Sequence, residues 1–295
     1  MSGSRVLVIG GDSQIGRRLG EILVDAGVTA FQTTRRSLVH TSSSYFFDLG
    51  RTAVVDADLP VAKTVVLCAG ISGYAACAKD PVLAAKVNFT DTVSLASRFL
   101  RDGSHVIFLS STASLGDAPE MSGEEARCSP VTVYGVLKRA VELALEEAAR
   151  QYGATLSIVR LTKVVSSDTP FVKGWLAAAK AGKVIDAFSN CKLSPVSLDY
   201  VCKGLLKIID EESGGLFHFS GVQAYTYLEF AASMAKTGLL PDRLIRTAVS
   251  SNTDDWMGYL DPAALGMERT EAVLSISAEP VVDVLAYLST SLSVH

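Results

Sequence analysis

Residues 5–16 read Arg5-Val6-Leu7-Val8-Ile9-Gly10-Gly11-Asp12-Ser13-Gln14-Ile15-Gly16. The mostly apolar run at 5–9 predicts a buried strand, and the amphipathic stretch at 15–26 predicts a helix. Between them, glycine lets the backbone turn tightly and approach a pyrophosphate, whose charge the helix N-terminus favours. A glycine-rich turn alone is weak evidence, but its place after the first strand indicates dinucleotide binding at Gly10, Ser13, Gln14, Ile15 and Gly16.

The same alternation of short apolar runs and longer amphipathic stretches continues to about residue 160. Further strands are expected at 28–33, 44–47, 64–68, 105–110, 155–160 and 216–219, with helices near 81–101, 133–151 and 199–210. Helices of this length between strands imply right-handed crossovers, and strands of Val, Ile, Leu and Phe without alternation imply cover on both faces. The fold class is therefore α/β, a Rossmann-type doubly wound parallel sheet with a smaller C-terminal substrate lobe.

The chain is expected to divide where this regularity ends. Residues 1–162 are assigned to a dinucleotide-binding domain to which 196–220 return, and 163–195 with 221–295 are assigned to a substrate-binding lobe. Breakers such as Thr169-Pro170 and Ser194-Pro195 mark the less regular half. The stretch from Val273 to His295 has helical periodicity but offers no interpretable site.

Composition excludes several classes of function. The net charge of −4 over 295 residues gives no basic field for nucleic acid. Mean hydropathy is +0.30, yet no run approaches the roughly 18 apolar residues of a membrane span. The five cysteines are odd in number and form no Cys-x-x-Cys pair, which indicates reduced thiols in the cytoplasm rather than a disulfide scaffold or a metal site.

Two arginines, Arg35 and Arg36, follow the second expected strand. An acid at this point would hydrogen-bond the ribose 2′-hydroxyl of NAD and repel a 2′-phosphate. No acid occurs between Asp25 and Asp48, and the planar fork of arginine suits a phosphate. The pair favours NADP over NAD, and two solvated surface arginines are the alternative.

The chain holds one Tyr-x-x-x-Lys match, Tyr134-Gly135-Val136-Leu137-Lys138, at the start of the expected helix 133–151. Spacing of four places both side chains on one helical face. A free tyrosine titrates near 10, so proton transfer near pH 7 needs a nearby lysine cation that lowers this pKa. The pattern predicts Tyr134 as a general acid tuned by Lys138, with a surface Tyr–Lys pair as the alternative.

These motifs resemble the extended short-chain dehydrogenases/reductases, and more narrowly their nucleotide-sugar branch of NAD-dependent epimerases/dehydratases and dTDP-4-dehydrorhamnose reductase. The resemblance covers about residues 1–220 in motif order. Extended members carry Gly-x-x-Gly-x-x-Gly, which maps to Gly10, Ser13 and Gly16, so Ser13 departs at the middle glycine.

The resemblance implies further cofactor residues. Asp48, with Leu49 after it, matches the acid that contacts adenine, and Cys68-Ala69-Gly70 matches the turn that lines the cofactor. Asn88 matches the structural asparagine of the following helix. The family's lysine also holds the nicotinamide ribose, a role that falls here on Lys138.

The resemblance also supplies a third catalytic group. The fifth strand runs into Ser110-Ser111-Thr112-Ala113-Ser114, which is similar to the family's serine-rich strand end. Ser111, with Thr112 as the fallback, would polarise the substrate carbonyl as charge grows on its oxygen. Hydroxyls that cap a loop are the alternative.

The resemblance also limits which reaction of the family this chain is expected to catalyse. Dehydratases follow the catalytic hydroxyl with an Asp-Glu pair, whereas Thr112-Ala113 follow Ser111 here. Epimerases keep tightly bound NAD, and the arginines Arg35 and Arg36 disfavour NAD as the cofactor. The prediction is an NADPH-dependent carbonyl reductase; an epimerase with bound NAD and a non-catalytic NADP-binding regulator stay open.

Substrate residues are inherited from the resemblance alone. Lys163 could bind a diphosphate and Trp175 a base or sugar ring, against a solvated lysine and a packing tryptophan. A nucleotide-linked keto-sugar is the expected substrate. Family members often pair through helices such as 81–101 and 133–151, so a homodimer and burial of those faces in the core both stay open.

Overall fold

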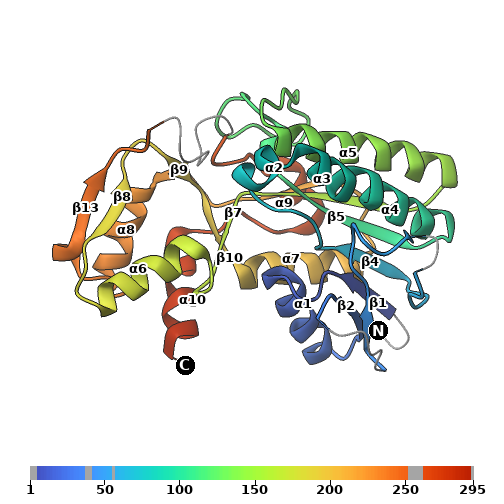
Figure 1. The fold of residues 1–295 in the computed structure, drawn as a ribbon, viewed down its shortest axis with the longest axis horizontal. Helices are drawn as coiled ribbons and strands as arrows, with labels where there is room; N and C mark the ends of the chain where they lie inside the picture. The colour runs from blue at the N-terminus through green and yellow to red at the C-terminus, as the bar shows by residue number, and fades with distance from the viewer. Residues whose placement is uncertain (1–4, 37–41, 55–56, 252–261, 294–295) are drawn as a thin grey trace.

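A computed structural model describes residues 5–36, 42–54, 57–251 and 262–293 and has one large parallel sheet (Figure 1). Its seven strands run in the order β11-β6-β5-β4-β1-β2-β3. Their bounds are β1 Arg5–Ile9, β2 Thr29–Thr34, β3 Ser44–Phe46, β4 Thr64–Leu67, β5 His105–Ser111, β6 Leu156–Leu161 and β11 Gly215–Phe219. All of these strands lie within one residue of the predicted limits, and the Rossmann-type fold class is confirmed.

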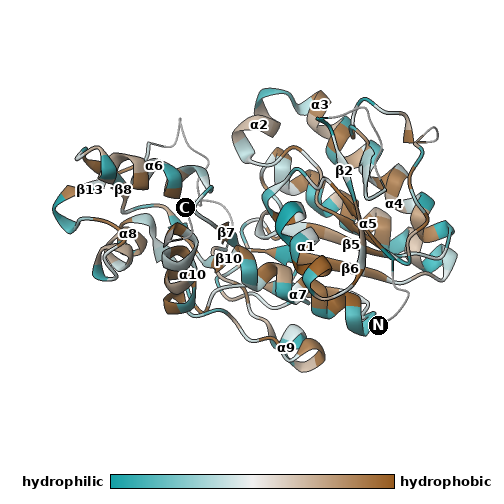
Figure 2. Ribbon diagram, turned by 90° about the horizontal axis from the view of Figure 1, so that it is seen from below, coloured by the Kyte–Doolittle hydropathy of each residue, from teal (hydrophilic) through white to brown (hydrophobic). Residues whose placement is uncertain are grey.

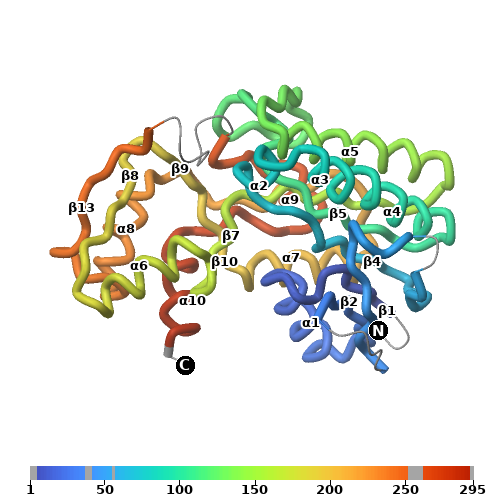
Figure 3. The backbone as a smooth tube through the Cα atoms, in the orientation of Figure 1, coloured from blue at the N-terminus to red at the C-terminus, as the bar shows by residue number. Residues whose placement is uncertain are grey.

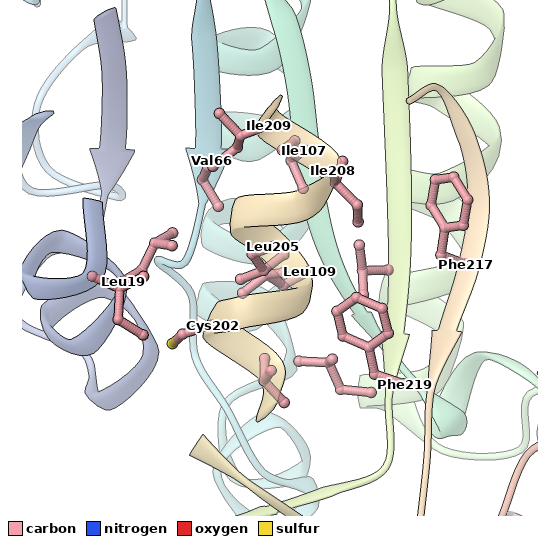
Figure 4. Close-up of a cluster of buried hydrophobic side chains, with 14 of the residues drawn as sticks. Leu19, Val66, Ile107, Leu109, Cys202, Leu205, Ile208, Ile209, Phe217 and Phe219 are labelled. Carbon is pink, nitrogen blue, oxygen red and sulfur yellow. The ribbon is translucent and has the colours of Figure 1, made fainter. Parts of the chain in front are cut away.

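Helices cover both faces of this sheet. On one face lie α1 (Gln14–Asp25) and α7 (Leu198–Glu211), and on the other α4 (Thr92–Arg101) and α5 (Val133–Tyr152) (Figure 1). Successive residues of β1 alternate between the two cores, as the pleat of a strand requires: Val6 packs with α1 and α7, and Leu7 packs with α4 and α5. Figure 4 shows the first core, where apolar side chains of α7 meet the strands.

The single helix expected at 81–101 is wrong. The structure has α3 (Pro81–Ala85), a π-helical turn η2 (Lys86–Asp91) and α4 in its place, preceded by a short α2 (Tyr74–Lys79) that sequence reasoning did not anticipate. At the end of η2, the hydroxyl of Thr92, the first residue of α4, donates to the Val87 carbonyl oxygen at 2.8 Å. A π-helical turn adds one residue to the hydrogen-bond ladder of a helix and hardly changes the spacing of its apolar residues. The sequence pattern therefore predicts one continuous helix.

A second group of elements, drawn at the left of Figure 1, has a hydrophobic core of its own. It comprises α6 (Pro170–Lys180), β8 (Ile185–Phe188), α8 (Tyr227–Lys236), β13 (Ile245–Ala248) and α10 (Val281–Ser293). Two short strand pairs accompany it: β7 (Lys163–Val165) with β10 (Pro195–Ser197), and β9 (Lys192–Leu193) with β12 (Tyr225–Thr226). In Figure 2, β7 and β10 lie between this group and the main sheet.

The tube in Figure 3 follows the chain from β6 through β7 into α6 and back through β10 to α7. Helix α9 (Glu268–Leu274) lies against β11 of the main sheet. The periodic stretch from Val273 onward is the end of α9, a break and α10; residues 294–295 lie outside the described ranges. Within those ranges, the helices lack the length and apolar composition needed to cross a bilayer.

Candidate active site

The glycine-rich turn is pressed against the turn that follows β4. Gly10 has a φ of +91°, and a Cβ there would lie 2.7 Å from the Ala69 backbone nitrogen. Its own N–H donates to the Thr33 hydroxyl at 2.8 Å, which ties the turn to β2. Only glycine fits this backbone, and the absence of a side chain leaves the turn open to a close ligand.

Ser13, the departure from the family motif, begins helix α1. Its φ of −73° suits any residue, and its hydroxyl accepts the Gly16 N–H at 3.0 Å. Serine therefore provides a helix cap where glycine would provide only freedom, and the N-terminus of α1 remains directed at the turn. A Cβ at Gly16 would lie 2.3 Å from the Gly10 carbonyl oxygen, so the third glycine is required by packing.

A cavity of about 600 Å³ lies beside this turn. Among the residues predicted to bind the cofactor, its walls include Gly10, Ser13, Arg35, Arg36, Asp48, Leu49, Cys68, Ala69 and Gly70. Its size and its place at the carboxyl ends of β1, β2 and β4 fit the adenosine and pyrophosphate part of a dinucleotide. A dinucleotide would lie there with its pyrophosphate at the turn and α1.

Gln14, Ile15, Gly16 and Asn88 are not among the residues lining this cavity. The Gln14 side chain accepts a hydrogen bond from Ser166 at 3.1 Å. Ile15 packs against the core shared with α7. Asn88 is buried in η2, where its amide bonds the N–H and carbonyl oxygen of Ile71 at 2.7 and 2.8 Å. Asn88 thus holds the segment after Gly70 in place, in keeping with a structural role.

Charges of both signs surround the outer part of the cavity. Arg36 Nε lies 3.7 Å from Asp12 Oδ1, and Arg51 Nε lies 3.6 Å from Asp48 Oδ2. Both arginine side chains are exposed, whereas the two carboxylates are largely covered. Asp12 comes from the glycine-rich turn and was not singled out from the sequence.

The N-terminus of α5 is packed tightly against the end of β5. Thr132 caps the helix by accepting the Gly135 N–H at 3.0 Å, and a Cβ at Gly135 would lie 2.2 Å from the Ala113 carbonyl oxygen. This close approach brings the first turn of α5, with Tyr134, to the turn that begins at Ser111. The Ser111 hydroxyl accepts the Ala113 N–H at 3.3 Å, so its own proton is free to be donated elsewhere.

Lys138 lies one helical turn after Tyr134 and points at the strand end. Its Nζ donates to the Leu109 carbonyl oxygen at 2.7 Å and lies 5.7 Å from the centre of the Tyr134 ring. Burial lowers the pKa of Lys138 to about 8, and the Glu142 carboxylate opposes that effect. At pH 7 the ammonium form therefore dominates and can stabilise a phenolate at Tyr134.

A second cavity, of about 510 Å³, opens where these groups lie. Ser111, Thr112, Tyr134 and Lys163 line it. The segment 70–73 runs along both cavities, because Gly70 and Ile71 line the first and Ser72 and Gly73 the second. Ser111, Thr112 and Tyr134 therefore line a space that borders the first cavity.

The structure corrects the expectation that Trp175 binds a base or sugar ring. It lies in the core of the C-terminal group and lines neither cavity. Its ring lies edge-on to Phe171 at 5.1 Å and to Tyr227 at 6.3 Å, and the residue is 8% exposed. Packing explains this tryptophan, and a role in binding a sugar or base is not supported.

Sequence reasoning missed several residues that line the second cavity, among them Tyr74, Lys192, Ser194 and Tyr227. The Tyr74 ring meets the Tyr134 ring edge-on at 5.6 Å. Lys192 lies on β9 and was one available signal, since it directly precedes the Leu193-Ser194-Pro195 return to the sheet. The others come from elements whose place depends on tertiary packing.

A parallel sheet with a cofactor-sized cavity over its first turn, and a tyrosine and lysine one turn apart beside it, is the arrangement of a Rossmann-type dehydrogenase. The family model described as NAD dependent epimerase/dehydratase family matches residues 6–194. The chain belongs to that family and is an NAD(P)-dependent enzyme of the extended short-chain dehydrogenase/reductase type.

Solved structures with the same fold cover nearly the whole chain. MoeE5 in complex with UDP-glucuronic acid and NAD is 21% identical over 98% of this chain and 99% of that one, with a TM-score of 0.82. UDP-glucose 4-epimerase from Thermotoga maritima, with UDP-glucose, is 17% identical over 98% of each chain at 0.80. dTDP-4-dehydrorhamnose reductase from Bacillus anthracis, with NADP, is 17% identical over 98% and 99% at 0.81. A comparison with curated protein sequences finds no significant match.

Proposed function

We propose that the protein is an NADPH-dependent reductase of a carbonyl, in which Tyr134 is the general acid and the substrate is a nucleotide-linked keto-sugar. The observation that carries the proposal is the shared cavity wall of Ser111 and Tyr134, bordering the cofactor cavity and backed by Lys138. Family membership supports the nicotinamide chemistry, and the cavities support the placement of its partners.

Each residue has a separate role at the carbonyl. The reduced nicotinamide supplies the hydride when bound. Ser111 donates a hydrogen bond to the carbonyl oxygen, and Tyr134 donates the proton that the new hydroxyl needs. Lys138 stabilises the phenolate that remains, and its anchorage on the Leu109 carbonyl oxygen fixes its position.

Two lysines support a diphosphate-linked substrate. Lys163 and Lys192 are exposed into the second cavity from β7 and β9. Ser194 and Tyr227 belong to the same wall, and among the residues that the structure describes, those lining the cavity include no carboxylate. This balance favours an anionic substrate, and three solved relatives of the fold carry UDP-sugars or belong to dTDP-sugar chemistry.

An epimerase with tightly bound NAD is the second candidate. Asp12 favours it, because a carboxylate at the outer end of the cofactor cavity suits an unphosphorylated ribose. The structural relatives hold NAD in one case and NADP in another, so the likeness of fold supports both cofactors. Chromatography of the denatured protein separates the candidates, since an epimerase of this kind releases stoichiometric NAD.

Removal of both arginines at the end of β2 is expected to abolish the preference for NADPH. Nucleotide-free wild-type protein should bind NADPH at least tenfold more tightly than NADH, and Arg35→Ala/Arg36→Ala should bring the two affinities together because the 2′-phosphate loses its cationic partners. A fluorescence titration measures both. The matched control is Arg101→Ala/Arg150→Ala, which removes two exposed arginines outside the cavity. Equal or NADH-favoured binding by wild type would overturn the NADP assignment.

Three further predictions stand beside this one as proposals. The division into a dinucleotide-binding domain (1–162 and 196–220) and a substrate lobe (163–195 and 221–295) is one of them. A cytoplasmic location is another. The third is a homodimer through the helical segments 81–101 and 133–151; on α5, Val136 and Leu143 are exposed and would lie in such an interface.

A further inference from the structure

The outer end of the cofactor cavity contains an acid that β2 itself does not supply. Asp12 belongs to the glycine-rich turn, yet its Oδ2 accepts the Arg35 N–H at 2.9 Å. The Thr34 hydroxyl lies 3.1 Å from each carboxylate oxygen. These bonds hold the carboxylate at the carboxyl end of β2, where a residue that reads the cofactor ribose is expected.

The same carboxylate partners one of the two arginines that would bind a 2′-phosphate. Arg36 Nε lies 3.7 Å from Asp12 Oδ1, with the arginine side chain 78% exposed and the aspartate 24%. An ion pair that is so exposed on one side is weak and can open. A phosphate that recruits Arg36 must therefore compete with a fixed negative charge for the same cation.

We propose that Asp12 is a specificity-determining residue, which favours an unphosphorylated ribose and weakens the 2′-phosphate site that Arg35 and Arg36 create. This inference rests on the proposed cofactor assignment and deepens it. The carboxylate has lone pairs left for a ribose 2′-hydroxyl, and it repels a phosphate at the same place. The site thereby accepts NADH as well as NADPH, with a preference set by the balance between one acid and two bases.

The experiment is a titration of nucleotide-free Asp12→Asn with NADPH and NADH, beside wild type. The amide oxygen can still accept the Arg35 N–H, so the turn keeps a partner while the charge is lost. We expect about tenfold tighter NADPH binding and several-fold weaker NADH binding. Glu21→Gln is the matched control, because it removes one exposed negative charge on α1 outside the cavity and should change neither affinity.

Equal change of both affinities, or no change in either, would overturn the proposal and leave Asp12 as a residue that only shapes the turn. If Asp12→Asn does not fold, Asp12→Ser tests the same change with a small neutral acceptor. The affinity ratio is compared between variants, so it can be read even where wild type prefers NADH and the NADPH assignment fails. Conversely, Arg35→Ala/Arg36→Ala tests that assignment with Asp12 intact.

Discussion

Tyr134→Phe is expected to lower the rate of carbonyl reduction by about 10² to 10⁴-fold while leaving NADPH affinity nearly unchanged. The phenol is the proton donor to the new hydroxyl, and phenylalanine keeps the ring packing against Tyr74 without that proton. Lys138 keeps its bond to the Leu109 carbonyl oxygen, so the surroundings of the cofactor are preserved.

The measurement follows NADPH absorbance with a panel of UDP- and dTDP-linked 4-keto-sugars, and a separate titration gives the nucleotide affinity. Tyr152→Phe is the control, because it makes the same chemical change at the exposed far end of the same helix. A variant that reduces the substrate as fast as wild type would refute the general-acid role. In that case another group donates the proton to the new hydroxyl.

The central sheet could be predicted from the sequence because its signals are local. Buried parallel strands read as apolar runs, and the turn at Gly10 directly follows the first of them. The C-terminal lobe could not be predicted in the same way. Strands such as β9 and β12 are two residues long and exist only because Lys192 and Thr226 meet across the lobe.

The candidate site likewise contains residues that local sequence patterns predict and residues that only tertiary packing brings together. The Tyr134–Lys138 spacing is a local pattern. In the structure, Tyr134 and Ser111 line one cavity, and Lys138 Nζ lies 5.7 Å from the centre of the Tyr134 ring. Asp12 escaped notice because the search for an acid followed β2, whereas the carboxylate reaches the end of that strand from 23 residues earlier in the chain. Trp175 was proposed as a substrate residue from the resemblance, and its burial depends on partners that no local pattern shows.

Glu142, on α5, is held by side chains from two strands of the main sheet. Its carboxylate is fully buried on α5 and accepts hydrogen bonds from Arg160 Nη2 at 2.7 Å and from the Ser110 hydroxyl at 2.5 Å. Arg139 adds a third donor at 2.9 Å. The side chain thereby joins α5, which carries Tyr134, to β5, which carries Ser111, and to β6.

Glu142→Ala is expected to lower the free energy of unfolding by about 3–5 kcal/mol, because it leaves the guanidinium of Arg160 buried without its counter-ion. Arg160 is 1% exposed, so water cannot replace the carboxylate. Urea unfolding measures the loss. Glu147→Gln is the control on the same helix, since it breaks an exposed pair with Arg150 and should cost no more than about 1 kcal/mol.

The ion pair between Glu142 and Arg160 also makes the stability lost in Glu142→Ala depend on pH, and the sign of that dependence follows from the pKa of Glu142. Burial disfavours ionisation of Glu142, yet the hydrogen bonds from Arg160 and Ser110 hold its pKa below the ordinary glutamate value. A lowered folded-state pKa contributes stability above the unfolded-state value, and that stability is lost as the pH falls through the folded-state value. The difference between wild type and Glu142→Ala should therefore shrink in acid. A variant with wild-type stability, or a difference independent of pH, would show that the buried pair does not hold these three elements together.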